Sequence, residues 1–185
     1  MNDGRFDNAV SGDFVRDGGD ETYEAEGLRV VDDAVLGHRV ITDRIIKTGE
    51  VVAIWRAPTM PGTRARALSP RERDYLLQID DDQFMYVGLG DLRTVDYINH
   101  SCDPNCGFTD AVTLAAMRTI DRGEVVTFDY AMSDSNSFIA FECRCGVPNC
   151  RGALSRNDWK LPDLQHRYAG WFAPHIQRLI DSQNA

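Results

Sequence analysis

The chain has 185 residues, of which 43% are hydrophobic, and a formal charge of −9. This length suits one domain with a hydrophobic core, and the excess of acid argues against non-specific nucleic-acid binding, which needs a basic surface. No apolar run approaches the ~20 residues of a membrane span, and the N-terminus lacks the basic and apolar segments of a secretion signal. We therefore expect a soluble intracellular protein, cytoplasmic or nuclear, with no membrane or direct nucleic-acid partner.

The acidic residues are concentrated at the N-terminus. Residues 1–26 hold eight of the 29 acidic residues but only two of the 20 basic ones. This segment has few branched apolar side chains, so we expect a loose acidic head. An acidic chain suits a basic partner, such as a lysine-rich peptide, through complementary charge. The sequence gives no indication of an oligomeric state.

The first half of the chain predicts short strands. β-branched runs between residues 27 and 55 are separated by Gly37 and Gly49, which is typical of strands and hairpins. Residues 56–66 contain two prolines and a glycine, and we expect a loop there.

A helix start follows at Ser69. Serine as the cap, Pro70 at the first helical position and Glu72 three residues after the serine form the pattern of a capping box. Apolar side chains at helical spacing extend this predicted helix to Ile79. The next segment, 84–89, is strand-like.

The second half continues the mainly β pattern. Residues 111–117 and 125–130 predict strands, and 133–137 a polar loop. Residues 161–180 have helical spacing interrupted by a glycine and a proline, which predicts two short helices. The pattern as a whole indicates one mainly β domain with few short helices.

Five cysteines are present, an odd number that favours metal ligands, nucleophiles or core thiols over a disulfide framework. Cys143, Cys145 and Cys150 have the spacing CxCx4C, and the glycine and proline between them allow three thiolates to converge on one ion. Structural zinc takes four ligands. The candidates for the fourth ligand lie in another segment: His100, Cys102 and Cys106.

Other chemistries fit the same residues. The thiols could be free in the core, or Cys143 and Cys145 could form a redox pair, although a disulfide across a CxC sequence is strained. His100 and Cys102 could form a cysteine–histidine catalytic pair, but such pairs usually come from distant segments and need a third orienting group.

Three stretches resemble the SET-domain protein-lysine methyltransferases. YINHSCDPNC (97–106) is similar to the NHSCxPN motif of that family, GEVVTFDY (123–130) to its GEELTFDY strand, and FECRCGVPNCRG (141–152) to its cysteine-rich post-SET segment. Upstream, GHRVIT (37–42) and KTGE (47–50) resemble the GxGVxA and KGE segments. The combination and order of these motifs are highly specific, although the cysteine-rich pre-SET region of many members is not seen.

The resemblance covers about residues 36–154 and implies the fold. The family has a β-clip-like fold of small antiparallel sheets with a pseudoknot, in which the C-terminal part passes under a preceding loop. This implies a SET domain at 27–138, a post-SET zinc-binding segment at 139–154 and a C-terminal helical tail at 155–185.

The resemblance also implies an activity: transfer of methyl groups from S-adenosylmethionine to a lysine of a basic protein, a histone or another. Tyr130 matches the catalytic tyrosine. The transfer is an in-line displacement that needs an aligned, neutral amine, and desolvation in a narrow apolar channel favours the neutral form of lysine.

The other expected site residues follow from the same motifs. Cofactor-binding residues are expected at Gly37, His38, Arg39, Tyr86, Asn99, His100 and Leu154. Phe128 and Tyr97 are expected to line the substrate channel, and a phenylalanine at position 128 goes with di- or trimethylation. Zinc ligands are expected at Cys102, Cys143, Cys145 and Cys150, which leaves Cys106 as a spare buried thiol.

Three residues depart from the family pattern. Arg39 stands in place of a glycine, Asp96 in place of an arginine and Trp55 in place of a tyrosine. A Cβ at position 39 could obstruct a close approach to the cofactor. The alternatives to an enzyme are therefore a catalytically inactive SET-fold binding module and a zinc-stapled interaction protein without cofactor.

Overall fold

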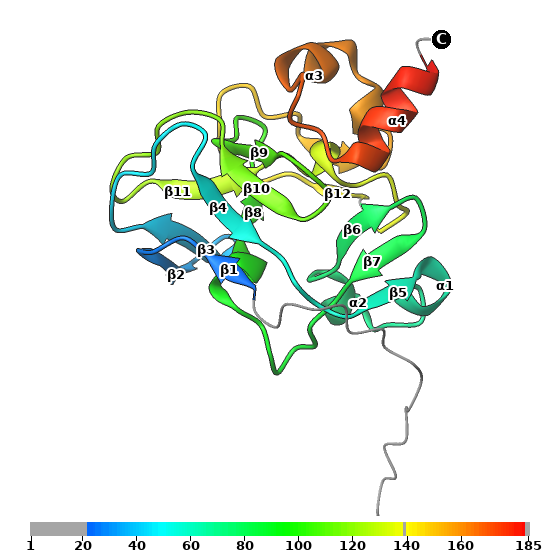
Figure 1. The fold of residues 1–185 in the computed structure, drawn as a ribbon, viewed down its shortest axis with the longest axis horizontal. Helices are drawn as coiled ribbons and strands as arrows, with labels where there is room; N and C mark the ends of the chain where they lie inside the picture. The colour runs from blue at the N-terminus through cyan, green and yellow to red at the C-terminus, as the bar shows by residue number, and fades with distance from the viewer. Residues whose placement is uncertain (1–21, 139, 184–185) are drawn as a thin grey trace, which may run out of the picture.

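The computed structural model describes residues 22–138 and 140–183. Most of the predicted acidic head lies outside these residues, but its last part contributes the short strand β1. The described chain forms one large sheet with two small sheets and a few short helices around it (Figure 1). The mainly β fold expected from the sequence is confirmed.

Eight strands form the large sheet. They are β1 (Tyr23–Glu24), β2 (Leu28–Asp33), β3 (Gly37–Thr42), β4 (Val51–Ile54), β8 (Asn99–His100), β9 (Cys106–Phe108), β10 (Thr113–Ala116) and β11 (Val125–Phe128). Their order is β1-β4-β10-β9-β11-β3-β2, and β8 pairs with β11. Strand β11 runs parallel to β8 and β9, whereas the other pairs are antiparallel. The parallel pairing sets the segment 99–106 beside the end of β11, where Tyr130 follows.

The two small sheets flank the large one. One consists of β5 (Thr59–Pro61), β6 (Leu77–Asp80) and β7 (Gln83–Met85) in the order β5-β7-β6; the other is the hairpin of β12 (Ala140–Glu142) and β13 (Ala153–Ser155). The cysteine-rich segment is the connection within this hairpin.

The described residues contain four α-helices: α1 (Gly62–Ala65), α2 (Pro70–Arg73), α3 (Pro162–Arg167) and α4 (Pro174–Gln183). There are also 3-10 turns at η1 (Thr94–Tyr97), η2 (Tyr130–Met132) and η3 (Asp158–Lys160). The two predicted tail helices, α3 and α4, are confirmed and lie together near β9 (Figure 1). None of these helices is long and apolar enough to cross a membrane.

The predicted helix from Ser69 to Ile79 is correct only at its start. The capping box is present: the Ser69 hydroxyl accepts from the Glu72 amide at 3.3 Å, and the Glu72 carboxylate accepts from the Ser69 amide at 2.8 Å. The helix ends at Arg73, however, and the following residues form β6. Pairing of β6 with β7 outweighs the helical spacing, because tertiary contacts override local propensity.

Other predicted boundaries shift for the same reason. The predicted loop at 56–66 contains β5 and α1, because β5 pairs with β7. The predicted strand at 84–89 ends at Met85, and the predicted strand at 125–130 ends at Phe128. Tyr130 therefore lies in a turn rather than in a strand.

A close backbone contact joins the tail to the sheet. In β9, a Cβ built on Gly107 would lie 2.7 Å from the Cβ of Trp171, and the Phe108 amide donates to the Trp171 carbonyl at 3.0 Å. The tail packs directly on the strand because glycine leaves the space for it.

The variant Gly107→Ala is therefore expected to lower the free energy of unfolding by about 1–3 kcal/mol, the usual cost of overpacking. Denaturant unfolding measures this change. The matched control is Gly90→Ala, because a Cβ at that position meets no atom within 4 Å. Equal stability of the two variants would contradict the close contact.

Candidate active site and metal centre

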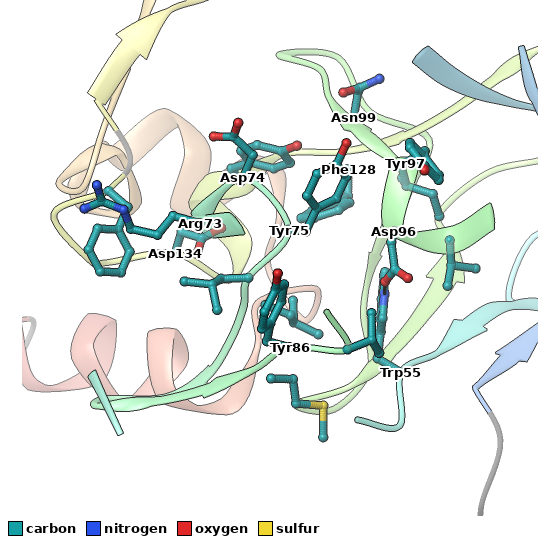
Figure 2. A pocket seen from close by; sticks show the side chains of 18 of the residues that line it. Trp55, Arg73, Asp74, Tyr75, Tyr86, Asp96, Tyr97, Asn99, Phe128 and Asp134 are labelled. Atoms are coloured by element: carbon teal, nitrogen blue, oxygen red, sulfur yellow. Dashed lines mark hydrogen bonds between the residues drawn. The ribbon is translucent and has the colours of Figure 1, made fainter. Parts of the chain in front are cut away.

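A cavity of about 950 Å³ lies between the end of β11, the start of β3 and the sheet that contains β6 and β7 (Figure 2). Aromatic rings form much of its wall: Trp55, Tyr75, Tyr86, Tyr97, Phe128, Tyr130, Phe138 and Phe141. The carboxylate and guanidinium side chains in its lining are Arg66, Arg73, Asp74, Asp96 and Asp134. A concave wall of aromatic rings interspersed with polar and charged groups is typical of a site for a small molecule or an inserted side chain.

Tyr130, in the turn η2, belongs to this wall. Its ring centroid lies 5.1 Å from that of Phe128, 5.4 Å from that of His100 and 6.2 Å from that of Phe141. Burial, and then the charge of Asp134, raises the pKa of the Tyr130 hydroxyl. The hydroxyl therefore stays protonated near neutral pH and can both donate and accept a hydrogen bond.

Asn99 connects β8 to β3. Its side-chain amide donates a hydrogen bond to the backbone carbonyl of His38, and the His38 ring lies edge-on to Tyr97 with 5.3 Å between centroids. All three residues line the cavity. Two segments 61 residues apart thus meet at one end of the cavity, where their amide and imidazole groups supply polar contacts.

The expected cofactor-binding residues divide into two groups. His38, Tyr86 and Asn99 line the cavity, as do the expected channel residues Phe128 and Tyr97. The cavity lining does not include Gly37, Arg39, His100 or Leu154.

The residues outside the lining have other surroundings. Arg39 points away from the neighbouring His38, as strand alternation requires, and its guanidinium lies 3.3 Å from the Asp33 carboxylate. Leu154 packs with Cys102 and Cys143. The backbone role of Gly37 and the roles of His100 and Leu154 toward a cofactor stay predictions.

Two of the departures from the family pattern contact each other. The Trp55 indole N–H donates to the Asp96 carboxylate at 3.1 Å, and the Arg93 amide donates to its other oxygen at 2.8 Å. Burial raises the pKa of Asp96 despite these bonds. Asp96 and Trp55 thus form a pair in the cavity wall that sequence reasoning missed, because 41 residues separate them.

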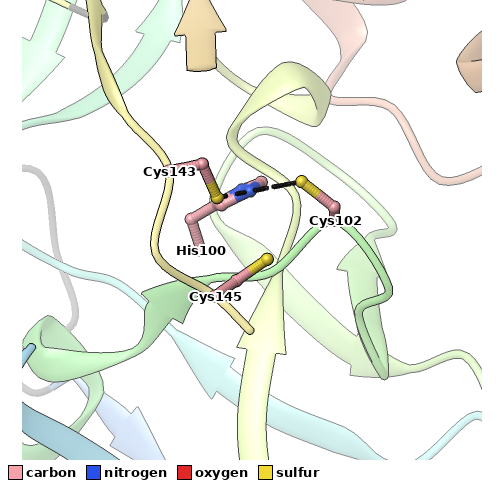
Figure 3. Close-up of side chains that lie close together, drawn as sticks. All are labelled: His100, Cys102, Cys143 and Cys145. Atoms are coloured by element: carbon pink, nitrogen blue, oxygen red, sulfur yellow. Dashed lines mark hydrogen bonds between the residues drawn. The ribbon is translucent and has the colours of Figure 1, made fainter. Parts of the chain in front are cut away.

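A cluster of sulfur and nitrogen atoms lies next to Tyr130, whose ring is 5.4 Å from that of His100. Figure 3 shows the four side chains of this cluster. The donor atoms of His100, Cys102, Cys143 and Cys145 all lie within 4.8 Å of one another. The two sulfurs of Cys102 and Cys143 are 3.9 Å apart, and His100 Nε2 is 3.2 Å from Cys102 Sγ. Two segments 41 residues apart thus converge on one point.

Cys150, the remaining expected ligand, packs against this cluster. Its sulfur accepts the Gly152 amide at 3.4 Å, and the Cys102 sulfur accepts the Arg151 amide at the same distance. Burial raises the pKa of the Cys102 thiol to about 11, and the bond from the Arg151 amide acts against this rise. The thiolate is the form that binds metal. Three or four thiolates beside an imidazole are a donor set that suits Zn²⁺.

Cys106 lies apart from the cluster. It is fully buried in the main core, on β9, as expected for the spare thiol. Burial raises its pKa strongly, which keeps the thiol neutral.

A buried ion network joins the cysteine–histidine cluster, the turn of Tyr130 and the tail. Asp129 is fully buried and accepts both terminal nitrogens of Arg151, at 2.5 and 2.8 Å, and the Tyr168 hydroxyl at 3.0 Å. The Tyr168 hydroxyl also lies 3.3 Å from the Cys102 carbonyl. Sequence reasoning missed these roles, because the pattern of the tail signals only helices.

Comparison with known proteins identifies the family of the chain. The model of the SET domain matches residues 37–131. The chain belongs to the SET domain family. The matched range contains Asn99, His100, Phe128 and Tyr130, whereas Cys143, Cys145 and Cys150 follow it.

Similar curated proteins are methyltransferases by name. The chain is 35% identical to histone-lysine N-methyltransferase ash1 of Drosophila melanogaster over 75 residues, which is 37% of this chain and 3% of that protein. It is 37% identical to histone-lysine N-methyltransferase trr of the same species over 86 residues, 42% of this chain and 3% of that protein. It is 31% identical to methyltransferase flvH of Aspergillus flavus over 87 residues, 45% of this chain and 48% of that protein. The match thus spans under half of each relative.

Proposed function

We propose that this SET domain protein is an S-adenosylmethionine-dependent protein-lysine N-methyltransferase acting on a basic protein, a histone or another. The observation that carries the proposal is the convergence of Asn99, Phe128 and Tyr130 on one aromatic cavity. The names of the similar proteins support the reaction class. Arg39, the departure that suggested an inactive binding module, lies outside the cavity lining and pairs with Asp33.

S-adenosylmethionine would supply a methyl group bound to a sulfonium sulfur. Asn99 and the nearby His38 backbone would hold its polar end by hydrogen bonds, since an amide both donates and accepts. The aromatic rings of the wall would limit the access of water to the reacting groups and disfavour the charged form of a substrate lysine. The neutral Tyr130 hydroxyl would orient the amine, and alignment of this kind lowers the barrier by several kcal/mol.

Phe128 is relevant to the number of methyl groups that a substrate lysine receives. Its ring packs edge-on against Phe108 and Trp55, with centroids 5.3 and 6.4 Å away, and it offers no hydroxyl to the cavity. An amine that meets no hydrogen-bonding group there has room for methyl substituents. We therefore propose di- or trimethylation as the outcome.

For zinc, we propose Cys102, Cys143, Cys145 and Cys150 as ligands, with His100 as their neighbour. His100 Nδ1 accepts the Tyr130 amide at 3.3 Å, so the ring proton belongs on Nε2, which faces the Cys102 sulfur. A ligand nitrogen cannot carry that proton. His100 would then donate to a bound thiolate and fix the turn of Tyr130, a supporting contact typical of metal centres.

The same proposal divides the chain by role. Residues 27–138 would form the methyltransferase domain, 139–154 the post-SET metal segment and 155–185 a helical tail. The tail would support the site through Tyr168.

The activity is tested with a donor that carries a labelled methyl group, using core histones and an array of lysine-containing peptides as substrates. Label on lysine, abolished when that lysine is replaced by arginine, is the expected result. A folded, zinc-loaded protein that binds no S-adenosylmethionine and labels no substrate would contradict the proposal.

The variant Asn99→Ala is expected to weaken S-adenosylmethionine binding about 5- to 150-fold, because a lost hydrogen bond that leaves its partner unsatisfied costs about 1–3 kcal/mol. Calorimetric titration of the zinc-loaded protein measures the affinity. The matched control is Asn157→Ala, at an exposed asparagine outside the cavity. Equal affinities of the two variants would remove Asn99 from the donor site.

A further inference from the structure

Asp134 is a buried carboxylate in the cavity wall (Figure 2). It follows the turn of Tyr130 in the segment expected only to be a polar loop, and it is 9% exposed. No basic side chain of the described residues forms an ion pair with it. Arg73, which lines the same cavity, stacks over the Phe138 ring at 5.2 Å instead. A buried charge without a counter-ion is costly, so its presence calls for a reason.

Neutral hydrogen-bond donors hold this carboxylate in place. The Ser133 hydroxyl donates to one oxygen at 3.1 Å and the Asn136 amide to the other at 3.0 Å. Asn136 also donates to the side-chain carbonyl of the buried Gln78 on β6, and His175 on α4 holds the Ser133 carbonyl at 2.7 Å. Groups from β6 and α4 therefore fix Asp134 without an ion pair to a basic side chain of the described residues, which is the arrangement of a preorganised site.

Asp134 lies one turn after Tyr130: its backbone amide donates to the Tyr130 carbonyl at 2.8 Å, and both residues line the cavity. Its charge is the second cause, after burial, that raises the pKa of Tyr130, and Asp74 and Tyr75 contribute further. Burial raises the pKa of Asp134 itself to about 7, against which the bonds from Ser133 and Asn136 act. Since the folded state holds this proton more tightly than the unfolded chain, stability falls as pH rises toward 7. The Asp134 carboxylate in its charged form therefore lowers the stability of the folded protein.

We propose that Asp134 is a catalytic residue of the proposed methyl transfer, the acceptor of the proton that the substrate lysine must lose. The inference rests on the proposed function. An N–H bond of the ammonium group breaks and an O–H bond forms on Asp134, which leaves a neutral amine and a neutral acid. The low-dielectric wall favours this neutral pair. The amine nitrogen then bonds the methyl carbon as the carbon–sulfur bond breaks, and that electron pair stays on sulfur. Asp134 afterwards releases its proton to solvent.

The test compares wild type with Asp134→Asn, a variant of the same shape. Asn136 keeps its bond to the amide oxygen, and the Ser133 hydroxyl can rotate to accept from the new amide. Initial rates are measured from about pH 6 to about pH 9.5 with a peptide labelled in the array, and with the same peptide carrying aminoethylcysteine for lysine. The amine of aminoethylcysteine loses its proton more readily.

We expect kcat of Asp134→Asn to fall about 100-fold near pH 7, the usual worth of a proton acceptor. The defect should shrink as pH rises and be smaller for the aminoethylcysteine peptide, because both supply amine that is already neutral. A second variant, Ser133→Ala, removes a bond to the charged form, so the acid limb of its profile should move to higher pH. If Asp134→Asn fails to fold, the pH profile of Ser133→Ala still tests the inference.

The matched control is Asp163→Asn, which removes an exposed carboxylate on α3 outside the cavity and should leave the shape of the pH profile as in wild type. Donor affinity and thermal midpoint report the fold of each variant. A defect of Asp134→Asn that is equal at every pH and for both amines, or no defect, overturns the inference. If wild type methylates nothing, the proposed function fails first, and this inference fails with it.

Discussion

Replacing Tyr130 by phenylalanine is expected to lower kcat of methyl transfer by about 100-fold or more, with S-adenosylmethionine affinity within about twofold of wild type. The substitution removes only the hydroxyl. The contacts of the ring with Phe128, His100 and Phe141 remain, so the cavity keeps its wall. The loss should therefore fall on the chemical step, in which the neutral hydroxyl orients the amine, rather than on binding.

Single-turnover rates with a labelled donor, beside calorimetric affinities, separate these two effects. The matched control is Tyr23→Phe, which deletes a hydroxyl from an exposed tyrosine on β1, outside the cavity. It should behave as wild type. A Tyr130→Phe variant that keeps the wild-type rate would remove the hydroxyl from the mechanism, even if the donor still binds.

Removal of zinc, or the substitution Cys143→Ser, is expected to lower the thermal midpoint by about 10 °C or more, since structural zinc contributes much of the folding free energy of small metal segments. The hairpin of β12 and β13 has little other support. All three residues of β12 are exposed, and the buried members of its hydrophobic cluster are Cys102, Cys143 and Leu154. Activity should be lost as well, because Phe141 on β12 lines the cavity.

Metal content by plasma emission, thermal unfolding and methylation rate are measured on the same samples. Cys106→Ala is the matched control, because it removes a buried thiol from the core rather than from the cluster. It should retain one zinc per chain and lose only the ~1–2 kcal/mol of a small cavity. If Cys143→Ser keeps full zinc and the wild-type midpoint, the assignment of the metal centre is wrong.

The motifs of the sequence predicted the fold class and the segments that meet, because each carries chemistry at a fixed spacing. NHSC and CxCx4C converge as expected, and the sulfurs of Cys102 and Cys143 are 3.9 Å apart. Short-range signals were also sound where local bonds decide the structure, as at the capping box of Ser69. The pseudoknot implied by the resemblance stays a prediction.

Features that depend on pairing between distant segments were not predicted from the sequence. Leu77 and Gln78 follow a helix signal, yet they form β6, and Gln78 then binds Ser135, 57 residues away. No local pattern encodes such a partner. The pairing of Trp55 with Asp96 was not predicted for the same reason. Each residue was read as a separate departure from the family pattern, whereas the Trp55 indole donates a hydrogen bond to the half-buried Asp96 carboxylate.

The contact of Tyr168 with Asp129 has a consequence for synthesis. Domains fold as they emerge, N-terminal parts first, and a nascent chain that has exposed every strand up to β13 still lacks Tyr168. Asp129 is then without its phenolic donor, and the Cys102 carbonyl lacks both Tyr168 and Arg167, which bind it at 3.3 and 3.0 Å. A premature stop after Ser155 would leave the complete sheet and all five cysteines. Asp129 and the Cys102 carbonyl, however, would lack their hydrogen bonds from Tyr168 and Arg167. In translation, the residues that secure the site are therefore made after the residues that form it.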